Sequence, residues 1–213
     1  MALSLGGLWR YPVKSMAGEA VHRAELTELG VPGDRLVWVR GPEGVRTARR
    51  QYRLLGLHGT LSPRGEALVD GQSWDSPEAA ALVREAAGDD AWLELAPPGE
   101  QFDILPLLVA TDGAVAEFGR DIRRLRPNLL IAGVPGMGEV GWEGATLAIG
   151  EARIELDSLR GRCPMTTVDP DTITRDPAVL KDIGRRFGGK LALNATVSRG
   201  GAIAVGDDVR LLR

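Results

Sequence analysis

The sequence predicts a mainly β protein with a few helices, built as a barrel or a sandwich. Short β-like runs dominate the chain, and glycine, proline and aspartate turn signals separate them at close intervals. Few stretches carry helix start signals. The chain has 213 residues, 44% hydrophobic and 26% charged, which is enough for one large β domain or two small ones without staples.

Ten strands are predicted from runs rich in β-branched and apolar residues. In chain order, the expected strands are Ser4 to Arg10, Val21 to Leu26, Arg35 to Arg40, Leu57 to Ser62, Trp92 to Leu95, Leu107 to Thr111, Leu129 to Ala132, Ala152 to Asp157, Leu191 to Ser198, and Val209 to Leu212. Turn signals between them include Pro32-Gly33-Asp34, Asp70-Gly71 and Gly200-Gly201.

Three helices are expected. Ser76-Pro77 and Asp176-Pro177 each place a capping side chain before a proline suited to the first helical turn. These helices should run to about Ala87 and about Phe187. A shorter one should follow Asp112 and end before Gly119.

The best candidate for a domain boundary is the stretch from Ala96 to Glu100. A double proline and a glycine interrupt strand pairing there. We therefore expect two domains, residues 1–96 and residues 97–213.

Composition excludes several classes of protein. The formal net charge of -3 gives no overall positive field for nucleic acid or anionic membrane. Two basic clusters, around Arg49 and around Arg123, are interpreted as solvated faces. The single cysteine excludes a disulfide framework and a zinc site of the cysteine-pair kind. The amino terminus has no basic segment followed by a long apolar run, so we expect neither a signal peptide nor a membrane anchor, and a cytoplasmic location.

The most informative segment is Arg160–Thr172, which contains that cysteine. Proline after Cys163 favours an extended backbone and a break in the strand. Arg160 and Arg162 would stabilise a thiolate, which is both a nucleophile and a soft metal ligand. A lone cysteine is often only a small buried hydrophobe, but this basic, proline-bounded neighbourhood favours a ligand. After it, Asp169 to Thr172 has good turn chemistry.

Other segments offer anion-binding side chains. Lys14 and Ser15 follow the first expected strand, where the lysine would hold an anion by charge and the serine by hydrogen bonding. Arg35 follows Gly33-Asp34, and Arg126 begins an Arg-Pro-Asn segment that ends at Asn128. Arginine's planar fork suits phosphate. A solvated lysine at a strand end is the alternative for Lys14.

Together these segments resemble the signatures of the MOSC domain family. The likeness rests on Arg126–Ile131, Gly161–Thr172 and Gly200–Asp207, and upstream Arg10–Met16 with Gly33-Asp34-Arg35 resembles the β-barrel domain that precedes MOSC in many members. The resemblance covers nearly the whole chain. It implies a small N-terminal β-barrel-type domain packed on a MOSC β-barrel, and a bound pterin-type molybdenum cofactor, as in the mitochondrial amidoxime-reducing component and its bacterial relatives.

The resemblance also implies roles for individual residues. Cys163 is expected to ligate molybdenum and to be the catalytic residue. The expected cofactor contacts are Lys14, Ser15, Arg35, Thr111, Asp112, Arg126, Asn128 and Arg162.

By the same resemblance, the function is that of a molybdenum-dependent oxidoreductase that reduces N-hydroxylated small molecules. The chain lacks the cysteine-rich iron–sulfur extension of some relatives, so the electrons should come from a separate protein of iron–sulfur, flavin or cytochrome type. Two alternatives stay open: a sulfur carrier with a persulfide on Cys163, or a metal-free scaffold.

Overall fold

The computed structural model describes residues 2–213, and it is mainly β with three α-helices. The strands are β1 (Leu3–Arg10), β2 (Glu19–Ala20), β3 (Arg23–Leu26), β4 (Val37–Gly41), β5 (Gly44–Arg46), β6 (Gly59–Leu61), β7 (Ala67–Val69), β8 (Gln72–Ser73), β9 (Trp92–Leu95), β10 (Leu107–Thr111), β11 (Leu129–Ala132), β12 (Thr146–Ile149), β13 (Ala152–Gly161), β14 (Lys190–Arg199), β15 (Gly201–Ala204) and β16 (Asp208–Leu212). The α-helices are α1 (Pro77–Ala87), α2 (Asp112–Phe118) and α3 (Pro177–Phe187). Short 3₁₀ helices are η1 (Tyr52–Gly56), η2 (Ile122–Arg124), η3 (Gly138–Trp142) and η4 (Pro164–Thr167). The predicted fold class is confirmed.

Seven strands close into a barrel in the order β1-β11-β10-β14-β13-β12-β16, because β16 and β11 both pair with β1. Only the β10–β11 pair is parallel among these neighbours. Closure removes the free edges that an open sheet would expose. The interior is filled by apolar side chains such as Leu5, Val109, Leu147 and Leu193.

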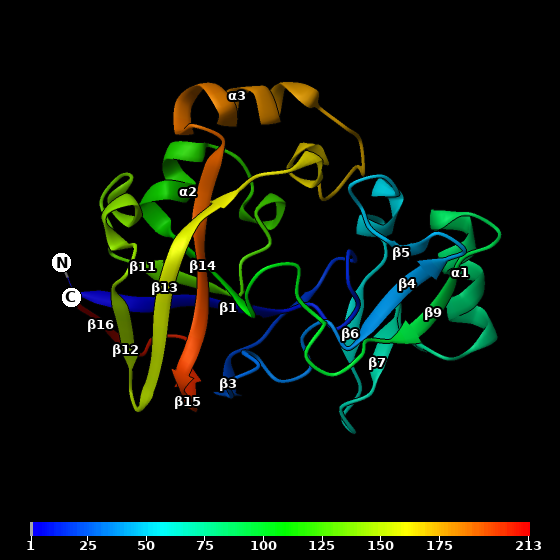
Figure 1. Ribbon diagram of the computed structural model, residues 1–213, viewed down its shortest axis with the longest axis horizontal. Coiled ribbons are helices and arrows are strands. Elements are labelled where there is room, and N and C mark those ends of the chain that lie inside the picture. Colours follow the sequence, from blue (N-terminus) through cyan, green and yellow to red (C-terminus); the bar gives the residue numbers. More distant parts are fainter. Residues whose placement is uncertain (1) are drawn as a thin grey trace.

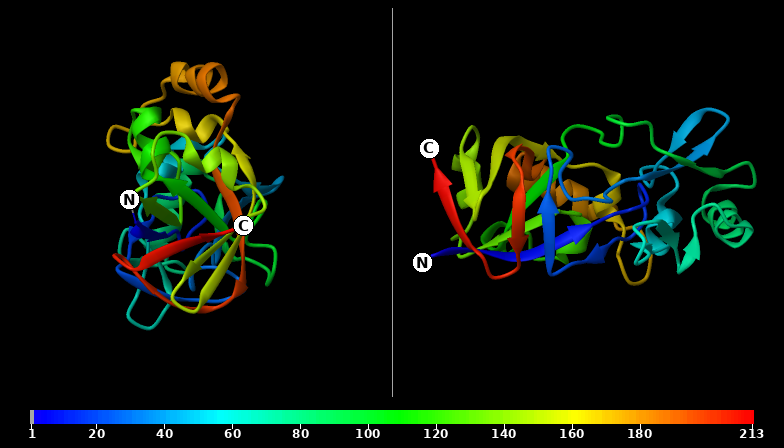
Figure 2. Two further views of the ribbon diagram at one scale, coloured as in Figure 1. Left: turned by 90° about the vertical axis from the view of Figure 1, so that its left-hand side faces the viewer. Right: turned by 90° about the horizontal axis from the view of Figure 1, so that it is seen from below.

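A second body holds two small sheets, β5-β4-β9 and β6-β7-β8, with α1 packed beside them. Its core includes Val37, Val39, Val69 and Val83. Figure 1 shows this body to the right of the barrel, with α3 above the barrel, and Figure 2 shows β1 running along the barrel toward it. Within residues 2–213, no helix is both long and apolar enough to cross a membrane.

The first strand belongs to the barrel although it comes from the amino-terminal part of the chain. Leu5 and Leu8 of β1 lie in the barrel core, and β3 pairs with β15 near the carboxyl terminus. The segment between β9 and β10 carries the chain from the second body back into the barrel. A domain boundary between residues 96 and 97 falls in that segment and stays a prediction.

The helix start signals work as predicted. The Ser76 hydroxyl accepts a hydrogen bond from the Ala79 amide at 3.1 Å, and the Asp176 carboxylate accepts one from the Ala178 amide at 2.9 Å. Each cap satisfies an amide that the first turn leaves without a partner inside the helix. The caps therefore fix where α1 and α3 begin.

Candidate functional site: a cationic pocket around Cys163

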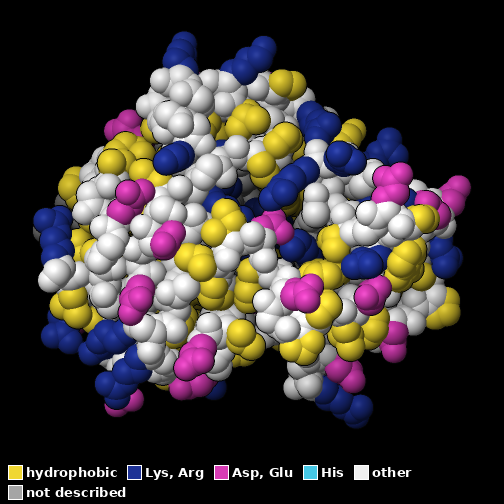
Figure 3. All heavy atoms as spheres, viewed as in Figure 1, with side chains coloured by type: hydrophobic (Ala, Val, Ile, Leu, Met, Phe, Trp, Pro, Cys, Tyr) yellow, Lys and Arg dark blue, Asp and Glu magenta, His cyan; other side chains and the backbone are white. Residues whose placement is uncertain are grey.

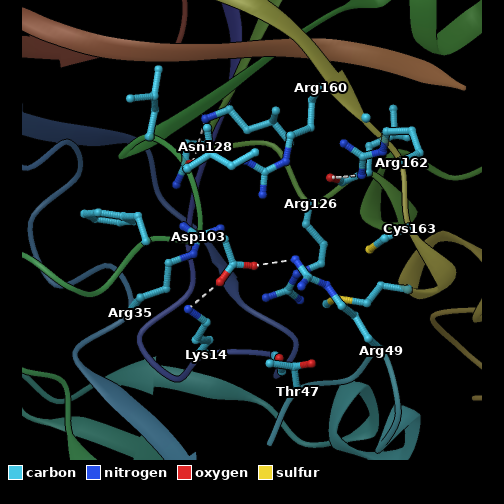
Figure 4. Close-up of a pocket in the computed structure, with 18 of the residues that line it drawn as sticks. Lys14, Arg35, Thr47, Arg49, Asp103, Arg126, Asn128, Arg160, Arg162 and Cys163 are labelled. Carbon is cyan, nitrogen blue, oxygen red and sulfur yellow. Dashed lines mark hydrogen bonds and ion pairs between the residues drawn. The ribbon is translucent and has the colours of Figure 1, made fainter. Parts of the chain in front are cut away.

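A pocket lies where the barrel meets the second body, and seven cationic side chains line it: Lys14, Arg35, Arg49, Arg124, Arg126, Arg160 and Arg162. Among the described residues, Asp103 is the only acidic side chain in its lining. Figure 3 shows Lys and Arg side chains gathered in the hollow between the two bodies, and Figure 4 shows several of them converging in the pocket. Such an arrangement favours an anionic ligand.

Three segments that are distant in the sequence build the pocket walls. Lys14 and Ser15 follow β1, Arg126 and Asn128 precede β11, and Arg162 and Cys163 follow β13. The segments meet because β1 pairs with β11 while β13 reaches the same end of the barrel (Figure 1). The structure thus gathers Lys14, Ser15, Arg35, Arg126, Asn128, Arg162 and Cys163 around one cavity.

Three of the lining residues have a left-handed backbone without being glycine. The φ angles are 71° at Ser15, 54° at Arg35 and 57° at Arg126. This conformation is costly for residues with a Cβ, and it persists only where the surroundings enforce it. Strained backbone of this kind clusters at functional sites, so its occurrence at three positions around one pocket supports a binding role.

A buried carboxylate, Asp34, ties these segments together. Its side chain accepts hydrogen bonds from the Tyr11 amide at 2.6 Å and from the Asn128 side-chain amide at 3.1 Å, and it pairs with the Arg35 guanidinium. The Asn128 side chain also accepts a hydrogen bond from the Leu108 amide at 3.1 Å. Asn128 therefore lines the pocket, but its side-chain oxygen and nitrogen are both engaged in hydrogen bonds within the protein. Its role is to hold these segments together.

The pocket guanidinium groups are held at an electrostatic cost. Burial, together with the neighbouring charge of Arg126, lowers the pKa of Arg35 to about 10. Burial likewise lowers the pKa of Arg162 to about 10 and the pKa of Arg126 below its ordinary value. A lowered pKa in a base means that its charged form is penalised. An anion in the pocket would relieve that penalty.

Several of these cations lack an internal partner of opposite charge. Within residues 2–213, no carboxylate pairs with Arg126, Arg160 or Arg162. Arg126 donates to the Met16 carbonyl at 2.5 Å and lies over the Tyr11 ring, and Arg162 donates to the Leu125 carbonyl at 2.7 Å. The Arg162 Nε is buried and has no hydrogen-bond partner. Buried hydrogen-bond donors are rarely left without a partner in folded proteins.

Cys163 stands at the end of β13, as the sequence predicted. The β13–β14 register shifts between Leu156 and Leu159 and again before Gly161, and such irregularities re-aim the residues that follow. Cys163 has an extended backbone, with φ −128° and ψ 173°, and caps η4. Its side chain is half-buried, and it lines the pocket. Figure 4 shows it close to Arg162.

The segment after Cys163 forms the turn that its aspartates predicted. The Asp169 carboxylate accepts hydrogen bonds from the Asp171 and Thr172 amides at 3.1 and 3.0 Å, and it pairs with Arg124 at 2.7 Å. Neither Asp169 nor Thr172 lines the pocket. The turn holds the cysteine segment against Arg124.

The structure does not bring Thr111 and Asp112 to the pocket lining. Thr111 caps α2, and its hydroxyl donates to the buried Glu139 carboxylate at 2.8 Å. The Asp112 carboxylate accepts from the Gly133 and Val134 amides at 2.7 and 2.9 Å. Both side chains are engaged in holding α2 and the turn after β11, and a cofactor contact from them stays a prediction.

Sequence reasoning missed several lining residues, among them Arg49, Phe102 and Asp103. Arg49 belongs to a cluster interpreted as a solvated face, yet it lines the pocket and pairs with Asp103 at 2.7 Å. Phe102 and Asp103 also line the pocket; they lie just after the stretch Ala96–Glu100 that was read as a domain boundary, and no role was predicted for them. No local signal marks them, because their place in the pocket depends on how that segment crosses between the two bodies. Arg160 was noticed for its effect on the thiolate, and it too lines the pocket.

Comparison with known proteins identifies the family. Residues 110–210 match the model of the MOSC domain, and residues 2–92 match that of the MOSC N-terminal beta barrel domain. The chain belongs to the MOSC domain family, with the N-terminal barrel domain that precedes MOSC in many members. The resemblance seen in the sequence is confirmed.

Two curated relatives match this chain at low sequence identity. The chain is 26% identical to mitochondrial amidoxime-reducing component 1 of Homo sapiens and 26% identical to mitochondrial amidoxime reducing component 2 of Macaca fascicularis. Each alignment covers 78% of this chain and 66% of the relative, so the chain spans slightly less than two thirds of their length. The structure of the YUAD protein from Bacillus subtilis is similar in fold, with a TM-score of 0.55 and 15% identity over 99% of this chain and 96% of that one.

Proposed function

We propose that this protein binds a pterin-type molybdenum cofactor in the cationic pocket and acts as an oxidoreductase on N-hydroxylated small molecules. MOSC domains are associated with molybdenum cofactor binding, and the curated relatives are named as amidoxime-reducing components. The observation that carries the proposal is that one cavity holds both the chain's single thiol and half-buried cations without an ionic partner, Arg126, Arg160 and Arg162.

The residues present suit such a group. A phosphate needs fixed cations and hydrogen-bond donors, and Lys14, Ser15, Arg35 and Arg126 supply them. The Arg162 Nε, buried without a partner, offers one further donor beside the thiol. A metal of this kind accepts a soft thiolate, and Cys163 is the only cysteine of the chain.

The protein's part in the chemistry is binding, orientation and electrostatics. The strained backbones of Ser15, Arg35 and Arg126 present their side chains already in place, which reduces the reorganisation that binding requires. The clustered arginines favour every anionic group that enters the pocket.

When bound, the cofactor supplies two-electron removal of oxygen from nitrogen. Each N–O bond broken consumes two electrons and two protons and releases one water molecule. The chain's single cysteine leaves no iron–sulfur cluster site within this sequence, so the electrons are proposed to come from a separate redox protein.

The experiment is turnover of an amidoxime by the cofactor-loaded protein, with reduced methyl viologen as the electron source. Wild type should form the amidine, and Cys163→Ala should form none while keeping its circular dichroism spectrum. Ser158→Ala, a change on β13 upstream of Cys163 and outside the pocket, is the matched control and should retain activity. Undiminished turnover by Cys163→Ala would refute the role of the thiol.

A further inference from the structure

One wall of the pocket is formed by a strap, residues 97–106, which has no helix or strand. Three consecutive residues of the strap contact pocket cations. The Gln101 carbonyl accepts a hydrogen bond from Lys14 Nζ at 3.2 Å, and the Phe102 ring lies 5.9 Å from the Arg35 guanidinium. Asp103 then pairs with Lys14 at 2.6 Å and with Arg49 at 2.7 Å.

These contacts are also the strap's polar attachment to the protein. Within the described chain, the hydrogen bonds and ion pairs that join residues 97–106 to other segments all involve Lys14 or Arg49. The remaining hydrogen bonds of the strap are local, such as Glu100 amide to Pro97 carbonyl. A change in the partners of Lys14 and Arg49 must therefore change how firmly the strap is attached to the protein.

Asp103 occupies the position that an anionic ligand would take. Figure 4 shows its carboxylate turned into the pocket, bridging Lys14 and Arg49. Burial would raise the pKa of Asp103, but the hydrogen bond and charge of Lys14 outweigh that effect and lower the pKa, so the side chain is ionised at neutral pH. Its side chain is 33% exposed, and exposed ion pairs are weak enough to exchange.

We propose that Asp103 is an internal counter-ion, which an incoming oxyanion displaces from Lys14 and Arg49, and that this exchange releases the strap from the pocket. The inference rests on the proposed function only in sharing the pocket. The oxyanion is either the phosphate of the resident cofactor or a carboxylate of a substrate, and the two sources are separable by experiment.

The first test is the affinity of the full chain, produced without the cofactor pathway, for inorganic phosphate by isothermal titration calorimetry. Asp103→Asn removes the competing charge and should bind phosphate about five- to tenfold more tightly than wild type. The matched control is Asp90→Asn, because Asp90 pairs with Arg46 at 2.7 Å outside the pocket. This control should leave the affinity unchanged.

The second test follows the strap itself by chymotrypsin cleavage after Phe102, read by mass spectrometry. Phosphate should accelerate cleavage of wild type relative to chloride at equal ionic strength, and Asp103→Asn should be cleaved rapidly without phosphate. If cofactor-loaded protein is already cleaved rapidly, the displacing group is the cofactor phosphate. If it is cleaved slowly until acetate is added, the displacing group is a substrate carboxylate.

Two outcomes would overturn the inference: phosphate affinity in Asp103→Asn equal to or weaker than that of wild type, or cleavage after Phe102 that ignores both phosphate and the substitution. Either result leaves the proposed function standing if wild type still carries molybdenum. Absence of molybdenum from the folded protein would instead refute the proposed function, while tighter phosphate binding by Asp103→Asn would still support the strap.

Discussion

Replacing Arg162 by methionine should stabilise the cofactor-free protein. The pKa of Arg162 falls well below the ordinary arginine value, to about 10, chiefly because the guanidinium is buried. At about 1.4 kcal/mol per pKa unit, keeping this side chain charged costs about 3 kcal/mol at neutral pH. Methionine removes that cost, fills a similar volume and leaves no orphan Nε.

The substitution also has a cost. The Leu125 and Leu191 carbonyls lose the hydrogen bonds that they accept from Arg162 at 2.7 and 3.5 Å, together worth about 1–2 kcal/mol. The net expectation is a gain of about 1–2 kcal/mol in the free energy of unfolding. Because the folded-state pKa lies below the unfolded one, the penalty applies fully below about pH 10 and disappears as the pH rises from there to the ordinary arginine pKa, so the gain should be complete at pH 7.

The assay is urea denaturation at pH 7 of protein produced without the cofactor pathway. Arg153→Met is the control, since Arg153 lies on β13, the strand that precedes Arg162, and donates to the Gly150 and Ala152 carbonyls outside the pocket. It should change stability by less than about 0.5 kcal/mol. A loss of 1 kcal/mol or more in Arg162→Met would refute the view that the pocket keeps an uncompensated cation at the expense of stability.

Two further predictions concern buried carboxylates. Asp34→Asn keeps the shape of the side chain but removes the charge that faces Arg35, and should lower the free energy of unfolding by about 3 kcal/mol in urea denaturation. An unchanged midpoint would contradict the role of Asp34 in tying these segments together. Burial raises the pKa of Glu139, so this group should make stability fall as pH rises from 4.5 toward its folded-state pKa. Glu139→Gln should remove that slope in denaturation series at several pH values. It should also cost about 1–3 kcal/mol, because the amide turns an NH₂ toward the Thr111 or Ala192 amide; a slope that persists would exclude Glu139 as its source.

Much of the fold follows from local sequence signals. Each of the ten predicted strands corresponds to a strand of the structure, and β9, β10 and β11 have the predicted bounds. Alternation and turn residues act over a few positions, so they are readable without a partner. Strand β12 was missed, although Leu147 and Ile149 belong to the barrel core. The Gly200-Gly201 pair reads as a turn, yet β15 begins at Gly201, which pairs with Leu26.

The closure of the barrel was not predictable in this way. It depends on β1 pairing with both β11 and β16, contacts between residues more than a hundred positions apart. The placement of β1 and β3 beside strands from the carboxyl-terminal half likewise depends on pairings between distant residues. Local propensity carries no information about such pairings.

For the candidate site too, residues with a local sequence signal were predicted and residues that depend on distant contacts were missed. The motif residues Lys14, Arg35, Arg126 and Cys163 were identified because each stands beside a turn or a strand end with unusual chemistry, and the resemblance to the family joined them. Asp103 was missed because its significance comes from two cations that lie elsewhere in the sequence. The engagement of Asn128 in internal hydrogen bonds is likewise visible only in three dimensions.

The central claim, that Cys163 supplies the protein's bond to a molybdenum cofactor, is tested most directly by X-ray absorption spectroscopy together with the molybdenum-to-protein ratio. Wild type and Cys163→Ser would be produced with a functional cofactor pathway. We predict near-stoichiometric molybdenum in wild type and one fewer sulfur neighbour at the metal in the variant. A folded wild type without molybdenum, or an identical sulfur shell in both proteins, would contradict the claim.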